Sequence, residues 1–337
     1  MMEIAMRRCW GLVAMLFVFG CSPEQTEPVV QYDTVERIEQ SVCTIETNGL
    51  PVATAFLVTY AGDQFLVTAR HCIQKLRNEI PHIMVRTNDA GATVSVPCFG
   101  CWQTADNGAD ACALRITELV GSLKSMGARL SFVDLDLDPS TYLPKTNTVD
   151  ALSGVGALSR KEFRDAGIRI GSEVYVLGTS VEVWDGYEDQ SVMPIVYRAG
   201  HISNVPGCKS YQQHLPTRDP RLPKTNLLVT DIPVVGGMSG GPVFAYGEIT
   251  PHGRPHYLIG VMVSIVPSRT NVGLLAEGSG VATNHLGYIV RFFPKKYDYR
   301  GNPFLSYVVP FDDVFECVLK ATPPIVIPTQ LLLGGDQ

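Results

Sequence analysis

A glycine-rich hexapeptide carries the residue of this sequence that is best suited to act as a nucleophile. It runs Gly237-Met238-Ser239-Gly240-Gly241-Pro242 and has apolar residues on both sides. Because glycine adopts positive φ at little cost, such a stretch can bend sharply and hold the Ser239 hydroxyl clear of the backbone. The same bend can turn the N–H groups of Gly237 and Ser239 toward one point and form an oxyanion hole there. The hexapeptide therefore indicates acyl transfer through a serine, provided that a base activates it.

Two upstream segments supply a base and an acid for this serine. A serine hydroxyl needs a base to take its proton, and the base needs an acid to orient it. An apolar strand leads into His71, and Asp110 opens a second apolar strand. Asp106 is the nearest alternative acid, but the Asn107-Gly108 pair that follows it is typical of a turn. We therefore predict a catalytic triad of His71, Asp110 and Ser239.

The three segments together resemble the signature blocks of the chymotrypsin-like serine proteases. In chain order they match Thr-Ala-x-His-Cys, Asp-x-x-x-Leu and Gly-x-Ser-Gly-Gly-Pro, and the strand Gly171–Gly178 resembles its counterpart in HtrA-type proteases. The resemblance spans about residues 41–321. It implies an all-β fold, a chymotrypsin-like double β-barrel with a short C-terminal helix, and a serine endopeptidase that cuts polypeptide substrates between the barrels. We expect no metal and no other cofactor, and too little chain follows Ala321 for a PDZ domain.

Several residues depart from the family pattern without removing a catalytic group. Arg70 stands where a small residue usually precedes the histidine, and Met238 stands where Asp or Asn often precedes the serine. Ala53 and Ala55 replace both glycines of the family's Gly-Thr-Gly-Phe-Leu-Val strand. Because the oxyanion hole uses backbone N–H groups, which Met238 keeps, we expect Arg70 and Met238 to reshape the cleft and leave the chemistry intact, with Met238 contributing mainly apolar contact.

The composition and the turn signals favour a β-rich fold that presents these residues at strand ends. Hydrophobic residues make up 45% of the 337 positions and charged residues 18%, with 31 glycines and 23 prolines, which favours a folded, turn-rich protein over disorder. The net charge of −6 gives no reason to expect nucleic-acid binding. Alternation and turn residues predict strands at 41–45, 52–60, 64–68, 83–86, 93–96, 110–116, 171–178, 198–203 and 257–265. Helices are expected at 159–166, where Ser159 and Glu162 form a capping box, and at 310–321, where Asp312 is the cap.

The N-terminus is typical of an exported protein. Arg7 and Arg8 precede an apolar stretch that is too short to span a bilayer comfortably, and Val18-Phe19-Gly20-Cys21 resembles a bacterial lipobox. That resemblance implies a lipid anchor on Cys21, and Ser22 after it argues for the outer membrane, facing the periplasm. An ordinary signal peptide is the alternative. The expected organisation is a signal peptide at 1–20, a tether at 21–36, a protease domain at 37–321 and a tail at 322–337.

The cysteines leave their pairing open. Of nine, Cys9 lies in the predicted signal and Cys21 at the lipid site, so seven remain and an odd number cannot all pair within the chain. Cys98-Phe99-Gly100-Cys101 favours a local disulfide or free thiols over zinc. Cys72 resembles the cysteine that pairs in animal trypsins, but the usual partner on the preceding strand is absent, which leaves Cys43 as one option.

The residues expected around the specificity pocket are uncharged. Trypsin carries an Asp six residues before its serine, where this chain has Pro233, while Asp231 matches the loop base of HtrA-type proteases. We predict that Val263, Ser264 and Ile265 bind the substrate as the second pocket wall. Since an apolar pocket would leave a charged side chain unpaired, we expect cleavage after apolar residues. Alternatively, these residues are barrel core and an insert around 119–169 lines the pocket.

Two other functions fit parts of the pattern. The hexapeptide also matches the G-x-S-x-G motif of α/β-hydrolase esterases, but that fold needs an acid and a histidine after the serine, and little chain remains for them. The second rival is a catalytically inactive protease fold that serves as a binding or scaffold lipoprotein. A serine-directed probe and peptide hydrolysis separate these possibilities.

Overall fold

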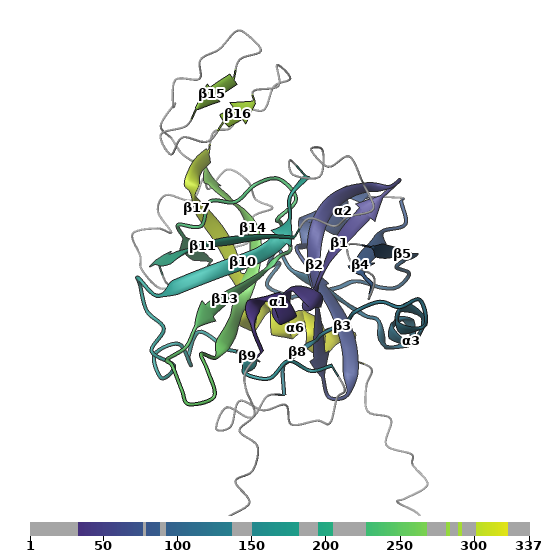
Figure 1. Cartoon of the computed structure of the whole chain (residues 1–337), viewed down its shortest axis with the longest axis horizontal. Helices are drawn as coiled ribbons and strands as arrows, with labels where there is room; N and C mark the ends of the chain where they lie inside the picture. Colours follow the sequence, from purple (N-terminus) through teal and green to yellow (C-terminus); the bar gives the residue numbers. More distant parts are fainter. Residues whose placement is uncertain are drawn as a thin grey trace, which may run out of the picture. The chain divides into compact units, whose positions relative to one another are not determined.

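The computed structural model describes residues 33–76, 79–87, 92–136, 150–181, 195–204, 227–267, 281–283, 289–291 and 301–322 (Figure 1). The predictions for the signal peptide, for Cys21 and for nearly all of the tail fall outside these residues. Both sheets described below belong to one unit, Gln31–Gln337.

The first sheet is built from the N-terminal strands and carries the predicted base and acid. It has the strand order β5-β4-β1-β2-β3-β7-β6, in antiparallel pairs, with β8 added parallel to β2. The pairing of β3 with β7 matters most for function, because the end of β3 meets the start of β7, with Thr68 opposite Cys112. Its strands are β1 (Val42–Thr47), β2 (Leu50–Tyr60), β3 (Asp63–Thr68), β4 (His82–Arg86), β5 (Thr93–Pro97), β6 (Gln103–Thr104), β7 (Cys112–Arg115) and β8 (Val133–Asp134).

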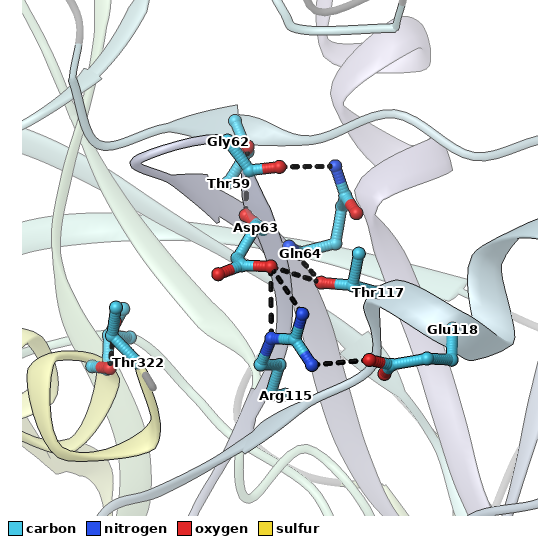
Figure 2. A network of polar contacts seen from close by, with 9 residues as sticks. Thr59, Gly62, Asp63, Gln64, Arg115, Thr117, Glu118 and Thr322 are labelled. Atoms are coloured by element: carbon cyan, nitrogen blue, oxygen red, sulfur yellow. Dashed lines mark hydrogen bonds and ion pairs between the residues drawn. The ribbon is translucent and has the colours of Figure 1, made fainter. Parts of the chain in front are cut away.

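A polar network fixes the far end of the β3–β7 pair (Figure 2). Arg115 at the end of β7 donates to Asp63 at the start of β3 over 2.9 Å and also contacts Glu118. The Thr117 hydroxyl donates to the same Asp63 oxygen over 2.9 Å and accepts from the Gln64 N–H over 3.0 Å. The tight turn between β2 and β3 has positive φ at both Ala61 and Gly62, as a two-residue hairpin requires. These contacts hold the register that brings the other end of the pair together.

The second sheet closes into a barrel and carries the predicted nucleophile. Its order is β13-β10-β11-β12-β17-β14-β9, and an additional β13–β14 pairing joins six of these strands into a closed ring. The strands β15 (Val281–Thr283) and β16 (Ile289–Arg291) form a separate pair. The other strands are β9 (Val155–Ala157), β10 (Glu173–Thr179), β11 (Ile195–Asn204), β12 (Leu228–Thr230), β13 (Pro242–Tyr246), β14 (His256–Pro267) and β17 (Gly301–Pro310).

Few helices accompany the sheets. The part of the chain that the structure describes holds α1 (Val35–Ile38), a 3₁₀ turn (Glu39–Ser41), α2 (Arg70–Leu76), α3 (Thr117–Ser125) and α6 (Phe311–Ala321). Two contiguous clusters of buried apolar side chains form the core, and the larger one draws on both sheets. The predicted fold class is therefore confirmed as mostly β, with a closed six-stranded barrel, few helices and a short C-terminal helix. Within the described ranges no helix is both long and apolar enough to cross a membrane.

Two helix predictions need correction. The segment 159–166 forms hydrogen-bonded turns and no helix, although Glu162 does accept from the Ser159 N–H over 2.7 Å. The chain bends at Gly167, where φ is +72°, before a regular helix can extend. Asp312 does not cap α6, whose N-cap is Pro310, because its carboxylate accepts instead from Arg160 over 2.9 Å.

Candidate active site

His71 and Asp110 meet where β3 and β7 begin to diverge. His71 lies in the first turn of α2, directly after β3, and Asp110 lies two residues before β7. One carboxylate oxygen of Asp110 is 2.6 Å from Nδ1 of His71, and the other accepts from the backbone N–H of His71 over 2.8 Å. The Asp110 carbonyl accepts from the Arg70 N–H over 3.3 Å. Asp110 thus holds the ring and the backbone of His71 together, as the sequence predicts for a base and the acid that orients it.

This environment changes the proton affinity of His71. Burial alone would lower its pKa, but the hydrogen bonds and charges of Asp110 and Cys72 raise it to about 9. When the ring is neutral, a proton on Nδ1 shared with Asp110 leaves Nε2 as the acceptor. That tautomer is the one that can take a proton from a serine.

The C-terminal helix fixes the loop that carries Asp110. On α6, Glu316 accepts from the Asp106 N–H over 2.7 Å, and Asp313 accepts from the Asn107 side chain over 2.7 Å. The Asp106 carboxylate pairs with Lys320 and is 88% exposed. Asp106, the alternative acid, therefore points at α6, whereas Asp110 contacts His71.

The glycines of the hexapeptide sit where no side chain fits. Gly237 and Gly240 have φ of +93° and +90°. A Cβ on Gly237 would lie 2.8 Å from the Thr179 carbonyl oxygen, and one on Gly240 would lie 2.0 Å from that of Thr54. The loop is thus pressed between the first sheet and β10 of the second, and only glycine can occupy both positions.

Most peptide groups of the serine loop, residues 236–241, have hydrogen-bond partners. The Gly236 carbonyl accepts from the Val181 N–H over 3.0 Å. The Gly237 carbonyl accepts from the Thr54 hydroxyl over 2.7 Å, and the Ser239 carbonyl accepts from the Thr54 N–H over 2.9 Å. The other backbone bonds of the loop join Met238 N–H to the Val235 carbonyl, Gly241 N–H to the Met238 carbonyl and Gly240 N–H to the Met262 carbonyl, and the Gly241 carbonyl accepts from Met262 N–H.

Two N–H groups of the hexapeptide have no partner of this kind. Within the described part of the chain, no acceptor is bonded to the N–H of Gly237 or of Ser239, nor to that of the exposed Gly236 before them. In a planar trans peptide the N–H points away from the carbonyl, so the Gly237 N–H points away from Val181. Gly237 and Ser239 are half-buried, and open N–H groups on either side of one residue, beside a serine hydroxyl, are donors of the kind that an oxyanion hole uses.

The serine hydroxyl and the histidine contact other groups in this structure. Ser239 Oγ donates to the Val263 carbonyl over 3.2 Å. Nε2 of His71 is 3.4 Å from Sγ of Cys72, which is also 3.9 Å from the Ser239 carbonyl oxygen. Although both residues belong to the described part of the chain, no hydrogen bond joins Ser239 to His71 there. Such bonds are often long or open without substrate.

The predicted pocket residues are described only in part. Val263 is buried in β14 and offers its carbonyl to Ser239, while Ser264 and Ile265 continue that strand opposite Tyr307 and Ser306, with side chains outside the described part. Met238 is fully buried among core side chains of the second barrel. The apolar contact expected of Met238 is therefore made in the barrel core and not in the cleft.

Asp231 is held at the base of the loop. Its carboxylate accepts from the backbone N–H of His201 on β11 and lies 3.5 Å from the His201 ring. Asp231 is thus tied to a neighbouring strand, as predicted, and its charge is already engaged.

The six described cysteines are free thiols: Cys43, Cys72, Cys98, Cys101, Cys112 and Cys317. The optional pairing of Cys72 with Cys43 is therefore not formed. Among the described residues, no group of three or more His, Cys, Asp or Glu is placed to hold a metal ion. Two functional contacts were missed by sequence reasoning, the thiol of Cys72 beside His71 and the hydroxyl of Thr54 beside the serine loop. Position next to a signature block is the only signal that points to Cys72.

Comparison with known proteins gives structural neighbours only. No model of a protein family matches the chain, and no curated protein matches it. The active form of the Rv3671c protease from M. tuberculosis is 15% identical, over 90% of this chain and 95% of that one, with a TM-score of 0.41. The HtrA-type protease AlgW with a tripeptide is 14% identical, over 85% of this chain and 61% of that one, with a TM-score of 0.42. A mutant of human heparin binding protein is 11% identical, over 88% of this chain and 97% of that one, with a TM-score of 0.40. Serine proteases are thus among its structural neighbours, while similarity at this level carries no argument about activity, which has to be judged from the contacts of the site.

Proposed function

We propose that this chain is a serine endopeptidase that uses His71, Asp110 and Ser239. The observation that carries the proposal is the combination of the Asp110–His71 pair with two N–H groups, on either side of Met238, for which the described part of the chain holds no acceptor. Each feature alone has ordinary structural explanations. Together they supply an oriented base and an anion-stabilising site around one hydroxyl, which is the set of groups that acyl transfer needs.

The proposed reaction follows from the position of each group. Ser239 Oγ attacks the substrate carbonyl carbon while Nε2 of His71 takes its proton. The carbonyl oxygen becomes an anion that accepts from the N–H groups of Gly237 and Ser239. His71, stabilised as a cation by Asp110, then gives its proton to the leaving amine, and water hydrolyses the acyl-enzyme by the same steps in reverse order.

Before this reaction, two contacts have to change. Ser239 Oγ has to leave the Val263 carbonyl, and Nε2 of His71 has to leave the Cys72 thiol. Both contacts are long, at 3.2 and 3.4 Å, and neutral hydrogen bonds contribute only about 0.5–1.5 kcal/mol each. A bound peptide can therefore replace them at small cost.

One observation favours the inactive binding or scaffold alternative. The nucleophile and the base are each engaged with another partner, an arrangement that a non-catalytic fold would also tolerate. The esterase alternative, in contrast, is contradicted by the fold, because an α/β-hydrolase needs a mainly parallel sheet flanked by helices.

The proposal extends to substrate and location. Uncharged residues precede Ser239, and Asp231 is engaged with β11, which supports cleavage after apolar side chains. The lipobox-like Val18-Phe19-Gly20-Cys21 supports a lipid anchor at Cys21 that holds the enzyme on the cell envelope, at the outer membrane facing the periplasm.

The first prediction concerns the nucleophile. Ser239→Ala removes the attacking oxygen, so peptide hydrolysis should fall by up to about 10⁶-fold while the fold is kept. Turnover of a peptide mixture and stoichiometric labelling by a fluorophosphonate measure this directly. A folded wild-type chain that neither hydrolyses peptides nor reacts with the probe would favour the scaffold alternative.

The second prediction concerns pH. Only neutral His71 accepts a proton, so kcat/KM should rise with pH through the raised pKa of His71, which is about 9. In Cys72→Ala one cause of the raised pKa is gone, and this rise should move to lower pH. The buried thiol of Cys98 does not touch His71, so Cys98→Ala is the matched control and should keep the wild-type profile. Identical profiles for all three proteins would contradict the role given to Cys72.

The third prediction concerns specificity. A peptide library digested by the wild type, with Ser239→Ala as the blank, should be cut mainly after Val, Leu or Ala. A charged side chain would be desolvated without a partner in such a pocket, which costs several kcal/mol. Mass spectrometry of the products identifies the residue before each cut, and a dominant cut after Lys, Arg, Asp or Glu would show that the pocket lies elsewhere.

The fourth prediction concerns the anchor. Two or more acyl chains bind a bilayer stably, since each buried CH₂ contributes about 0.8 kcal/mol. Cys21→Ala should therefore release the protein from membranes or stall its processing, as fractionation and mass spectrometry of the N-terminus would report. A wild-type protein with an unmodified N-terminus in the soluble fraction would rule the anchor out.

A further inference from the structure

We propose that Thr54 is a positioning residue that sets the two open N–H groups of the serine loop. Thr54 lies on β2 of the first sheet and is completely buried, whereas the loop it contacts belongs to the second sheet. The oxyanion role of these N–H groups rests on the proposed function. That Thr54 holds their geometry is an inference from the contacts themselves.

All polar groups of Thr54 are engaged. Its N–H donates to the Ser239 carbonyl over 2.9 Å, and its carbonyl accepts from the Thr68 hydroxyl over 2.6 Å. Its own hydroxyl accepts from the Thr179 N–H over 2.8 Å and donates to the Gly237 carbonyl over 2.7 Å. A hydroxyl has one proton. Because Thr179 is a donor, that proton is available for Gly237, and the direction of the bond is fixed.

The two carbonyls that Thr54 holds are the ones that matter for the loop. They belong to the 237–238 and 239–240 peptides, and the peptide between them carries the open N–H of Ser239. The N–H ends of these peptides are also held, Met238 by the Val235 carbonyl over 3.3 Å and Gly240 by the Met262 carbonyl over 2.7 Å. The 237–238 peptide has the longer of these two bonds and a glycine without a Cβ, so it depends most on Thr54. If the Gly237 carbonyl were released, the 237–238 peptide could turn and change the direction of the N–H groups beside it.

No other group can easily take over this role. A Cβ on Gly178 would already lie 3.0 Å from the Thr54 hydroxyl oxygen, so the surroundings are filled. The Thr44 hydroxyl contacts the hydroxyl of Thr179 and continues the polar layer between the sheets. Removing only the Thr54 hydroxyl would leave the Thr179 N–H and the Gly237 carbonyl buried and unpaired.

Thr54→Val tests the inference because it keeps the shape of the side chain and removes the hydroxyl. We expect kcat to fall about 10²-fold, with a much smaller change in KM, because loss or misplacement of an oxyanion donor has effects of this size. Affinity for a peptide boronic acid, a mimic of the tetrahedral state, should fall in parallel. Thr54→Ser keeps the hydroxyl and should restore both values, while the pH dependence set by His71 stays the same.

Thr230→Val is the matched control. Thr230 is also completely buried, and its hydroxyl is 2.7 Å from the Ser306 hydroxyl, between β12 and β17, with no hydrogen bond to the serine loop among the described residues. The Thr230→Val variant should lower the midpoint of thermal unfolding as Thr54→Val does, and it should leave kcat unchanged. Should Thr54→Val fail to fold, Thr54→Ala replaces it with the same expectations.

The outcomes separate this inference from the proposed function. A folded Thr54→Val with wild-type kcat would overturn it, as would an equal loss in Thr54→Ser or Thr230→Val. If the wild type hydrolyses no peptide, the proposed function fails, and crystal structures of the variants decide about Thr54. The inference then requires that the 237–238 peptide turn in Thr54→Val and keep its place in Thr54→Ser; an unmoved peptide in both would overturn it.

Discussion

The serine loop is buried between two sheets, and its peptide groups need hydrogen-bond partners there. Neither sheet supplies them alone: Thr54 comes from the first, while Val181 and Met262 come from the second. A buried carbonyl or N–H without a partner costs about 1–3 kcal/mol, so the loop can take this shape only when both sheets are in place. The bonded peptide groups of the loop hold the two N–H groups that are left open. The geometry of the site therefore depends on both sheets.

The predicted base, His71, is likewise held by contacts between distant parts of the chain. β3 and β7 bring His71 and Asp110 together, but the loop before Asp110 is tied to α6, at the far end of the described chain. The N-terminal sheet thus positions the nucleophile's loop, and the C-terminal helix positions the acid's loop. Each half of the site depends on an element from the other half of the sequence.

These contacts between distant segments explain which parts of the site the sequence can predict. His71, Asp110 and Ser239 stand next to strands with clear patterns, so their neighbourhood follows from local signals and from the family resemblance. The role of Thr54 depends on contacts with residues more than 100 positions away, and no local pattern encodes it. The 159–166 helix fails for the opposite reason, because a correct local capping contact between Ser159 and Glu162 leads only into turns that end at Gly167.

The contacts of the site differ in strength in a way that suits a serine nucleophile. The Asp110–His71 contact is short, at 2.6 Å, and joins a carboxylate to a ring that its environment favours as a cation, so it is of the strong, charge-assisted kind. The contacts of Ser239 with Val263 and of His71 with Cys72 are longer, and the second involves sulfur, which hydrogen-bonds weakly. A ligand that enters the site will therefore displace the second kind first. In the proposed reaction the His71 ring then stays oriented while Ser239 Oγ and Nε2 become free to meet, so the free chain can hold them apart without blocking that reaction.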